Sequence, residues 1–385
     1  MPLGVYFHLP YCITKCPYCD FNSYAIKGEF PEDRYVLALL NEIEIYGPLI
    51  EENGIKTIFF GGGTPSLFSS KSVSKILNKL RSYSDISDDV EISLEANPKT
   101  IDLKKLKEIK TVGINRVSVG VQSFNQRKLN FYGRINSPKD SEDVLNNIKK
   151  AGFDNFNLDL IYGSSKEGLD ELKEDLEKAM EFEPAHLSAY CLTIEDGTEF
   201  GRLFNEGKLL IPNEEILLEF MVYTSDFLES RGYINYEISN FSKPDFECKH
   251  NLVYWKSKDY LGIGAGAHSH INIDSQQIYG RRWSNYRSPK YYMQTLENNK
   301  SAVCESRELS SDMSLEERLL MGLRLKEGVC LDNIEKKYDK KLNLDKIDFL
   351  IDDDFVEIKN NYIRLSKKGF LFANNLIAQI LDSFY

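Results

Sequence analysis

The stretch Cys12-Ile13-Thr14-Lys15-Cys16-Pro17-Tyr18-Cys19 decides how this chain is interpreted. Its three cysteines are spaced C-x3-C-x2-C, and the next cysteine in the sequence is Cys191. Thiolates are soft ligands that suit iron–sulfur clusters and zinc. Zinc sites prefer four closed ligands and C-x2-C pairs, so zinc is the weaker interpretation. A four-iron cube held by three thiolates would leave one iron open to another ligand.

An open iron is typical of proteins that use S-adenosylmethionine (SAM), because it can chelate the amino and carboxylate groups of SAM and pass it an electron. The flanking segments Tyr6-Phe7-His8-Leu9-Pro10-Tyr11-Cys12 and Cys16-Pro17-Tyr18-Cys19-Asp20-Phe21 agree with this interpretation. They resemble the opening of the HemN/HemW family of radical SAM proteins. That family includes an oxygen-independent coproporphyrinogen III dehydrogenase and a haem chaperone. The resemblance extends over nearly the whole chain.

Length and composition indicate a soluble protein of two or three domains, with 385 residues, 42% hydrophobic and 28% charged. The net charge of −11 argues against a nucleic-acid partner bound through a basic surface. Seven cysteines, three of them clustered, fit a reducing cytoplasm better than a disulfide framework. We expect a cytoplasmic location, with no secretory signal and no apolar run of transmembrane length. Peripheral membrane association and a homodimer stay open.

Over residues 1–235, short apolar runs alternate with amphipathic segments, which predicts repeated βα units. Helices are expected to begin at Pro31–Asp33 and at Ser70, and to cover Glu214–Ser230. Six such units would form an α/β fold, a partial (β/α)6 barrel of the TIM type, with its chemistry at the C-terminal strand ends. The expected strands are Val5–His8, Thr57–Phe60, Val90–Glu95, Arg116–Val119, Phe156–Leu160 and Leu187–Tyr190.

Beyond the barrel the rhythm of the sequence changes. Tyr233–Ile238 is expected to be a further strand, and a glycine- and aromatic-rich stretch follows it. With the resemblance, we predict a radical SAM core barrel over 1–235 and a barrel-covering HemN-type extension over 236–310. Residues 311–385 are predicted to form a C-terminal α+β, winged-helix-like domain.

Gly61-Gly62-Gly63-Thr64-Pro65-Ser66 follows the second predicted strand. Glycines let the backbone approach a ligand closely. The absence of a following Gly-Lys-Ser/Thr disfavours a P-loop, and a plain tight turn stays open. The stretch resembles the family's GGGTP motif, which binds the amino group of SAM. Other matches occur in order at later strand ends, such as Glu95 in an ExNP motif.

The resemblance implies a role for each of these residues. Cys12, Cys16 and Cys19 would hold a [4Fe-4S] cluster. Arg134 suits a carboxylate through its planar fork, and Asp159 could hold ribose hydroxyls. The residues implied to contact SAM are Tyr6, Tyr18, Gly62, Gly63, Thr64, Glu95, Gln122, Arg134, Asp159 and Thr193.

Two features distinguish this chain from the dehydrogenase branch of the family. The dehydrogenase has a fourth cysteine two residues beyond the third, where this chain has Phe21. The chain also begins five residues before Tyr6, without the N-terminal extension of the dehydrogenase. Both features favour the haem chaperone branch.

A third feature is the segment His250-Asn251-Leu252-Val253-Tyr254-Trp255, which is similar to the HNxxYW motif of the family's haem chaperones. Imidazole is a common axial ligand of haem, so His250 is the candidate haem residue. Cys248 is an alternative thiolate. Without the resemblance, His250 would be interpreted as an ordinary hydrogen-bonded histidine and Trp255 as core.

The segment Gly262–His270 partly resembles a dinucleotide-binding fingerprint, but no βαβ unit surrounds it. His268 and His270 form an HxH pair, which without a third ligand is a weak metal site. We therefore expect close backbone packing over the barrel mouth, near SAM.

These observations predict a haem chaperone that binds a [4Fe-4S] cluster, SAM and haem. Its expected partners are haem-acceptor proteins and an electron donor for the cluster. The alternative is a coproporphyrinogen III dehydrogenase, in which SAM is cleaved to a 5′-deoxyadenosyl radical that abstracts hydrogen from propionate side chains. A radical SAM enzyme acting on another substrate is a third interpretation. Whether the chain is an enzyme is left open.

Overall fold

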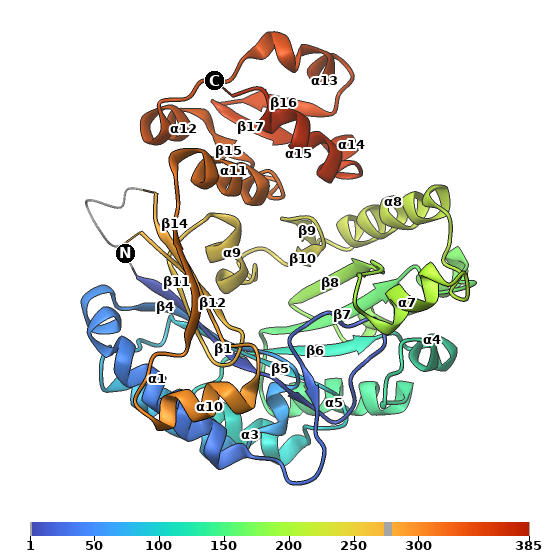
Figure 1. Ribbon diagram of the computed structural model, residues 1–385. Helices are drawn as coiled ribbons and strands as arrows, with labels where there is room; N and C mark the ends of the chain where they lie inside the picture. The colour runs from blue at the N-terminus through green and yellow to red at the C-terminus, as the bar shows by residue number, and fades with distance from the viewer. Residues whose placement is uncertain (1, 273–278, 385) are drawn as a thin grey trace.

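A computed structural model describes residues 2–272 and 279–384 of the chain. Within these residues, a single large sheet has the strand order β14-β13-β12-β11-β1-β4-β5-β6-β7-β8-β10-β9. It curves into an incomplete barrel (Figure 1). The six central strands pair in parallel and in chain order, which confirms the predicted α/β fold. They are β1 (Leu3–Leu9), β4 (Ile55–Gly62), β5 (Glu91–Ala96), β6 (Arg116–Gln122), β7 (Phe156–Tyr162) and β8 (His186–Cys191).

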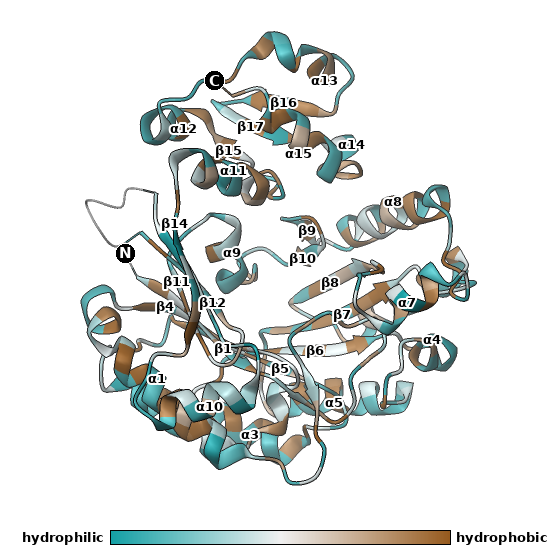
Figure 2. Ribbon diagram, viewed as in Figure 1, coloured by the Kyte–Doolittle hydropathy of each residue, from teal (hydrophilic) through white to brown (hydrophobic). Residues whose placement is uncertain are grey.

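The barrel strands are mostly buried because both of their faces are covered, as parallel sheets require, and apolar residues alternate with polar ones along most of them. In β1, six of the seven residues are buried, including Val5 and Phe7. Figure 2 shows brown, hydrophobic segments on barrel strands such as β7 and β8, and helices whose outer faces are largely teal and hydrophilic. This pattern places the main core between the sheet and the surrounding helices.

Helices follow the barrel strands and cover the outside of the sheet (Figure 1). The predicted helix starts near Glu32 and at Ser70 are confirmed, and so are the bounds Glu214–Ser230. Side-chain caps define several starts, such as the reciprocal capping box of Ser137 and Asp140. The helices are α1 (Glu32–Asn53), α2 (Ser70–Arg81), α3 (Leu103–Val112), α4 (Gln126–Phe131), α5 (Pro138–Lys150), α6 (Leu169–Glu181), α7 (Glu199–Asn205) and α8 (Glu214–Ser230), with a 3-10 turn η1 (Pro65–Leu67).

The sheet continues beyond both ends of the barrel. On one side, β11 pairs in parallel with β1, and three antiparallel neighbours follow it. On the other side, β10 pairs antiparallel with β8. The added elements are β9 (Ile234–Asn235), β10 (Asn240–Ser242), α9 (Lys249–Trp255), β11 (Tyr260–Ile263), β12 (His268–Ile271), β13 (Arg281–Asn285), α10 (Pro289–Glu297) and β14 (Val303–Glu308).

One predicted strand is shorter than expected. Tyr233–Ile238 contributes only the two residues of β9 before the chain turns. The cause is Glu237, whose buried carboxylate accepts hydrogen bonds from the Ser239 N–H and the Asn240 side-chain amide. These local bonds compete with the ladder of a longer strand.

The C-terminal unit has its own core and a small sheet in the order β15-β17-β16. Asn360 and Asn361 both have positive φ, which suits the tight hairpin between β16 and β17. The proposed domain limits at 235 and 310 stay predictions, and 273–278 of the middle segment lie outside the described residues. The elements are α11 (Ser311–Gly322), β15 (Val329–Cys330), α12 (Leu331–Tyr338), η2 (Leu344–Lys346), α13 (Asp348–Asp352), β16 (Val356–Lys359), β17 (Tyr362–Leu365), α14 (Lys367–Phe370) and α15 (Ala373–Leu381).

Among the described residues, no helix combines the length and apolar character needed to cross a bilayer.

Candidate functional site

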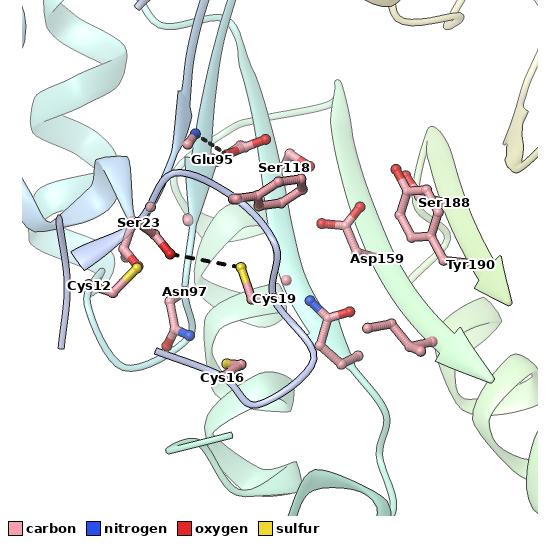
Figure 3. Close-up of a pocket in the computed structure, with 18 of the residues that line it drawn as sticks. Cys12, Cys16, Cys19, Ser23, Glu95, Asn97, Ser118, Asp159, Ser188 and Tyr190 are labelled. Carbon is pink, nitrogen blue, oxygen red and sulfur yellow. Dashed lines mark hydrogen bonds between the residues drawn. The ribbon is translucent and has the colours of Figure 1, made fainter. Parts of the chain in front are cut away.

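A cavity of about 710 Å³ opens at the C-terminal ends of the barrel strands, and we call it the cysteine cavity. It brings together all the residues predicted to contact the cluster or SAM and the candidate haem residue His250, whereas the alternative haem thiolate, Cys248, is buried against Glu91 and does not line it. Figure 3 shows the three cysteines on their loop, with Glu95 and Asp159 on strands nearby. The predicted residues that line it are Tyr6, Cys12, Cys16, Tyr18, Cys19, Gly62, Gly63, Thr64, Glu95, Gln122, Arg134, Asp159, Thr193 and His250.

The cysteine loop is closed at its base by two short strands, β2 (Tyr11–Cys12) and β3 (Tyr24–Ala25), which pair in parallel. The Tyr24 N–H also donates to the Pro10 carbonyl at 2.7 Å, and the Ile26 N–H donates to the Cys12 carbonyl at 2.9 Å. The loop therefore leaves β1 and returns at a fixed position. All three cysteines of the loop line the cysteine cavity, as Figure 3 shows beside Glu95 and Asp159.

Each thiol lies near one polar group. The Thr64 hydroxyl donates to Cys12 Sγ at 3.4 Å, and Arg134 Nη1 donates to Cys16 Sγ at 3.8 Å. The Ser23 hydroxyl lies 3.9 Å from Cys19 Sγ. Burial raises the pKa of the Cys12 and Cys19 thiols, and these neighbouring donors favour the thiolate form that a metal requires.

Across 2–272 and 279–384, no three His, Cys, Asp or Glu side chains converge as a mononuclear site would need. A four-iron cube is bound differently, with one thiolate for each ligated iron. Three free, partly exposed thiols around one cavity fit a cube held at three corners.

The glycine loop after β4 is fixed against the cysteine loop by backbone hydrogen bonds. The Gly63 N–H donates to the Leu9 carbonyl at 2.9 Å, and the Thr64 N–H donates to the Tyr11 carbonyl at 2.8 Å. A Cβ atom at Gly63 would come within 2.7 Å of the Tyr11 carbonyl oxygen. Only glycine permits this approach, so the two loops form one wall of the cavity.

Two partly buried carboxyl groups lie on β5 and β7, with β6 between these strands. Glu95 accepts a hydrogen bond from the Gly62 N–H at 3.1 Å, and Asp159 accepts one from the Asn157 side-chain amide at 2.7 Å. Burial, and then the negative charge of Asp159, raise the pKa of Glu95 to about 7. Burial also raises the pKa of Asp159. Both carboxyl groups therefore favour a bound cation or hydroxyl donors.

Three buried polar atoms of residues that line the cavity have no hydrogen-bond partner among the described residues, namely Arg116 Nε, Gln122 Oε1 and Arg134 Nε. Gln122 has a φ of 70° at the end of β6, which is uncommon for a non-glycine residue. Arg134 is positioned by a hydrogen bond from Nη2 to the Gly120 carbonyl at 2.5 Å. Unsatisfied buried polar atoms are costly, so they indicate a polar ligand such as SAM.

Sequence analysis missed a set of polar side chains inside the barrel. Asn157 lies two residues before Asp159 on β7 and donates to the Ser118 hydroxyl at 2.8 Å. His186 Nδ1 lies 2.6 Å from Asn157 Oδ1. Residues two apart on a strand share a face. The position of Asn157, two residues before the predicted site residue Asp159, could therefore have indicated that its side chain also faces the site.

His250 is fully buried, and both of its ring nitrogens are bonded. Nδ1 lies 2.8 Å from the Thr57 hydroxyl, and Nε2 lies 2.8 Å from the Tyr254 hydroxyl. Burial, and then the charge of Arg116, lower the pKa of His250 to about 3, so the ring is neutral. The role of His250 in haem contact stays a prediction.

Comparison with known proteins completes this description. Residues 6–179 match the radical SAM superfamily, and residues 309–372 match the HemN C-terminal domain. The chain is 35% identical to the heme chaperone HemW of Escherichia coli (strain K12) over 386 residues, which cover 99% of this chain and 98% of the relative. It is 36% identical over 386 residues to the heme chaperone HemW of Haemophilus influenzae, again covering 99% and 98%.

Among solved structures, the fold is similar to that of the coproporphyrinogen III oxidase HemN from Escherichia coli, a radical SAM enzyme. The TM-score is 0.83 at 25% sequence identity, and the match covers 98% of this chain and 90% of HemN.

Proposed function

The chain belongs to the HemW family of radical SAM proteins, and on this premise we propose that it is a haem chaperone. In this proposal it binds a [4Fe-4S] cluster, SAM and haem, and delivers haem to acceptor proteins. The observation that carries the proposal is identity to relatives named heme chaperone over 99% of the chain.

Cys12, Cys16 and Cys19 would hold the cluster, as the free thiols around the cysteine cavity support. When bound, such a cluster supplies an electron to SAM. Thr64 and Arg134 would donate hydrogen bonds to two of the cluster thiolates, which lowers their charge density. An electron donor for the cluster is part of the proposal.

SAM would lie between the glycine loop and the strand ends. The backbone of Gly62 and Gly63 can approach the ligand closely, and Arg134 offers an unpartnered Nε to a carboxylate. Asp159, oriented by Asn157, can accept hydrogen bonds from ribose hydroxyls. Burial of these groups excludes water, so each contact is stronger than on the surface.

The second candidate function is that of HemN, because the two folds agree with a TM-score of 0.83. Phe21 argues against it. This side chain, 62% exposed, lines the cavity where the dehydrogenase branch carries a further thiol. Fold alone does not decide function, so the two candidates need a chemical test.

The test uses anaerobic, cluster-reconstituted protein with SAM, a reductant and coproporphyrinogen III, and separates the porphyrins by chromatography. In parallel, ferric haem is added to the same protein, and its transfer to an apo-haemoprotein is followed by absorbance. We expect haem binding and transfer without protoporphyrinogen. Formation of protoporphyrinogen would overturn the chaperone proposal, and so would failure of the intact protein to bind haem.

A further inference from the structure

A second cavity, of about 720 Å³, adjoins the cysteine cavity, and we call it the lateral cavity. The two cavities share a wall that includes Tyr6, Glu95 and Tyr254. Its volume falls in the range of about 300–1,000 Å³ that is usual for small-molecule sites. Met321 of α11 also lines it, so the C-terminal unit contributes to its enclosure.

Aromatic rings form much of the lateral cavity. Phe21, Tyr254, Trp255 and Tyr260 line it together. Tyr254 and Tyr260 meet edge to face with their ring centroids 4.6 Å apart. Walls of this kind favour a flat, largely apolar ligand with its own π system.

Two arginines at the same cavity provide positive charge. Arg282 donates to Glu317 and to the Tyr260 hydroxyl, each at 2.7 Å, and its remaining N–H groups are still available. The exposed Arg287 guanidinium has no hydrogen bond to the part of the chain that is described, while its carbonyl accepts from Asn22 at 3.0 Å. The flat ligand should therefore carry carboxylates, which pair well with guanidinium groups.

His268 lies on the same rim, on β12, and lines the lateral cavity. His268 pairs with Ser284 of β13. His270, two residues further along β12, pairs with Arg282 of β13. Because paired residues, and residues two apart on one strand, point to the same side, these side chains share one face of the sheet. Neither ring nitrogen of His268 is hydrogen-bonded to any described residue, and the side chain is exposed. Partial desolvation of the ring at the cavity rim, followed by the charges of Arg282 and Arg287, lowers the pKa of His268 and keeps its ring neutral and able to bind a metal.

We propose that the lateral cavity is the haem site, with His268 as an axial ligand of the haem iron and with Arg282 and Arg287 facing the propionates. In this arrangement His250 is a positioning residue, which holds the Tyr254 hydroxyl at the wall between the two cavities. The assignment rests on the proposed function, because it requires that the chain bind haem.

The first test titrates ferric haem into the full chain and records the Soret band and the electron paramagnetic resonance spectrum. We expect His268→Ala to bind haem roughly tenfold or more weakly and to change the spectrum, as loss of a metal-site partner does. Free imidazole added to this variant should restore the wild-type spectrum. Since His268 is exposed, the substitution should not disturb folding.

The second test uses haem dimethyl ester, whose propionates carry no charge. Arg287→Ala should weaken haem binding by roughly tenfold, the effect of losing a hydrogen bond to a charged group. Arg287→Ala should leave the affinity for the dimethyl ester unchanged. A substitution that disturbed the cavity in general would weaken the binding of both compounds.

The outcomes separate the two proposals. If wild-type protein binds haem while His268→Ala keeps the same affinity and spectrum, the assignment of His268 is overturned and the chaperone proposal stands. If His250→Ala instead abolishes the ligation spectrum and imidazole restores it, His250 is the ligand. If the wild-type protein does not bind haem, both proposals fail.

Discussion

His250 and Tyr254 share a hydrogen bond of 2.8 Å between Nε2 and the phenol oxygen, and their rings meet at 90°. On its other side, His250 is bonded to the Thr57 hydroxyl on β4. The ring thus connects α9 to the barrel and fixes the orientation of Tyr254 between the two cavities. This arrangement predicts a cost in stability when His250 is removed.

His250→Ala should lower the free energy of unfolding by about 2–4 kcal/mol, because it leaves a cavity and an unpartnered hydroxyl at Thr57. Tyr254→Phe, which removes only the phenol oxygen, should cost about 1 kcal/mol. Urea unfolding of both variants and of the double variant measures this. Additive losses in the double variant would contradict a direct interaction between the two side chains.

Acid should destabilise the protein through its buried histidines. The pKa of His250 is about 3 in the folded chain against 6.5 for an ordinary histidine, and burial also lowers the pKa of His186 well below that value. The unfolded chain therefore binds protons first. Stability should be full above pH 6.5 and fall as pH decreases toward 3, with about 2 kcal/mol lost at pH 5 through His250. Unfolding midpoints measured between pH 8 and pH 5 check the sign, and His250→Ala should show a shallower decline.

The cluster ligands can be tested against a matched cysteine. Cys16→Ala should abolish the four-iron absorbance after anaerobic reconstitution, because a cube cannot be held stably by the remaining two thiolates. Cys304→Ala removes an exposed cysteine outside the cavity and should leave cluster content unchanged. Iron and sulfide analysis gives the number of irons per chain. A full cluster in Cys16→Ala would contradict the ligand assignment.

The hydrogen bond from Thr64 to Cys12 gives a further prediction. Hydrogen bonds to cluster sulfurs raise the reduction potential by stabilising the extra negative charge. Thr64→Val keeps the shape of the side chain but removes the donor, so the potential should fall. Ser23→Ala removes the more distant contact at 3.9 Å and should have a smaller effect. Equal potentials in wild type and Thr64→Val, measured by redox titration, would exclude a role for this bond.

The sequence predicts those helices and strands in which apolar residues recur with a clear helical or strand period. Strands such as Phe156–Tyr162 carry apolar residues at every second position, and helices such as Ser70–Arg81 have an apolar stripe and a cap. The added strands β12 and β14 were missed because they lack this contrast, and β11, although fully buried, is only four residues long and lies in a glycine-rich stretch. In β14, five of six residues are exposed, and β12 alternates histidine with serine instead of polar with apolar residues.

The candidate site follows a similar rule. Residues in glycine- or cysteine-rich motifs could be named in advance because their spacing reports a backbone shape or a ligand set. Arg287 could not, and His268 was named only as half of a weak HxH metal pair, because the two residues come from separate segments whose approach depends on the pairing of β11, β12 and β13. The partial resemblance of Gly262–His270 to a dinucleotide-binding fingerprint does not predict that β11, β12 and β13 pair with one another.

The final prediction concerns Glu95 and the binding of SAM, which carries a positive sulfonium. The pKa of Glu95 is about 7, so its carboxylate is mostly charged at pH 8 and mostly protonated at pH 6. Affinity for SAM should therefore fall by about tenfold from pH 8 to pH 6 as the attraction is lost. Glu95→Gln should bind SAM roughly tenfold more weakly at pH 8 and show a flat profile, since an amide does not titrate. Thr193→Ala, at the exposed edge of the same cavity, should keep the wild-type pH profile. Calorimetric titration on reconstituted protein gives all three curves, and a wild-type affinity that stays constant between pH 6 and pH 8 would show that the Glu95 charge does not contribute to SAM binding.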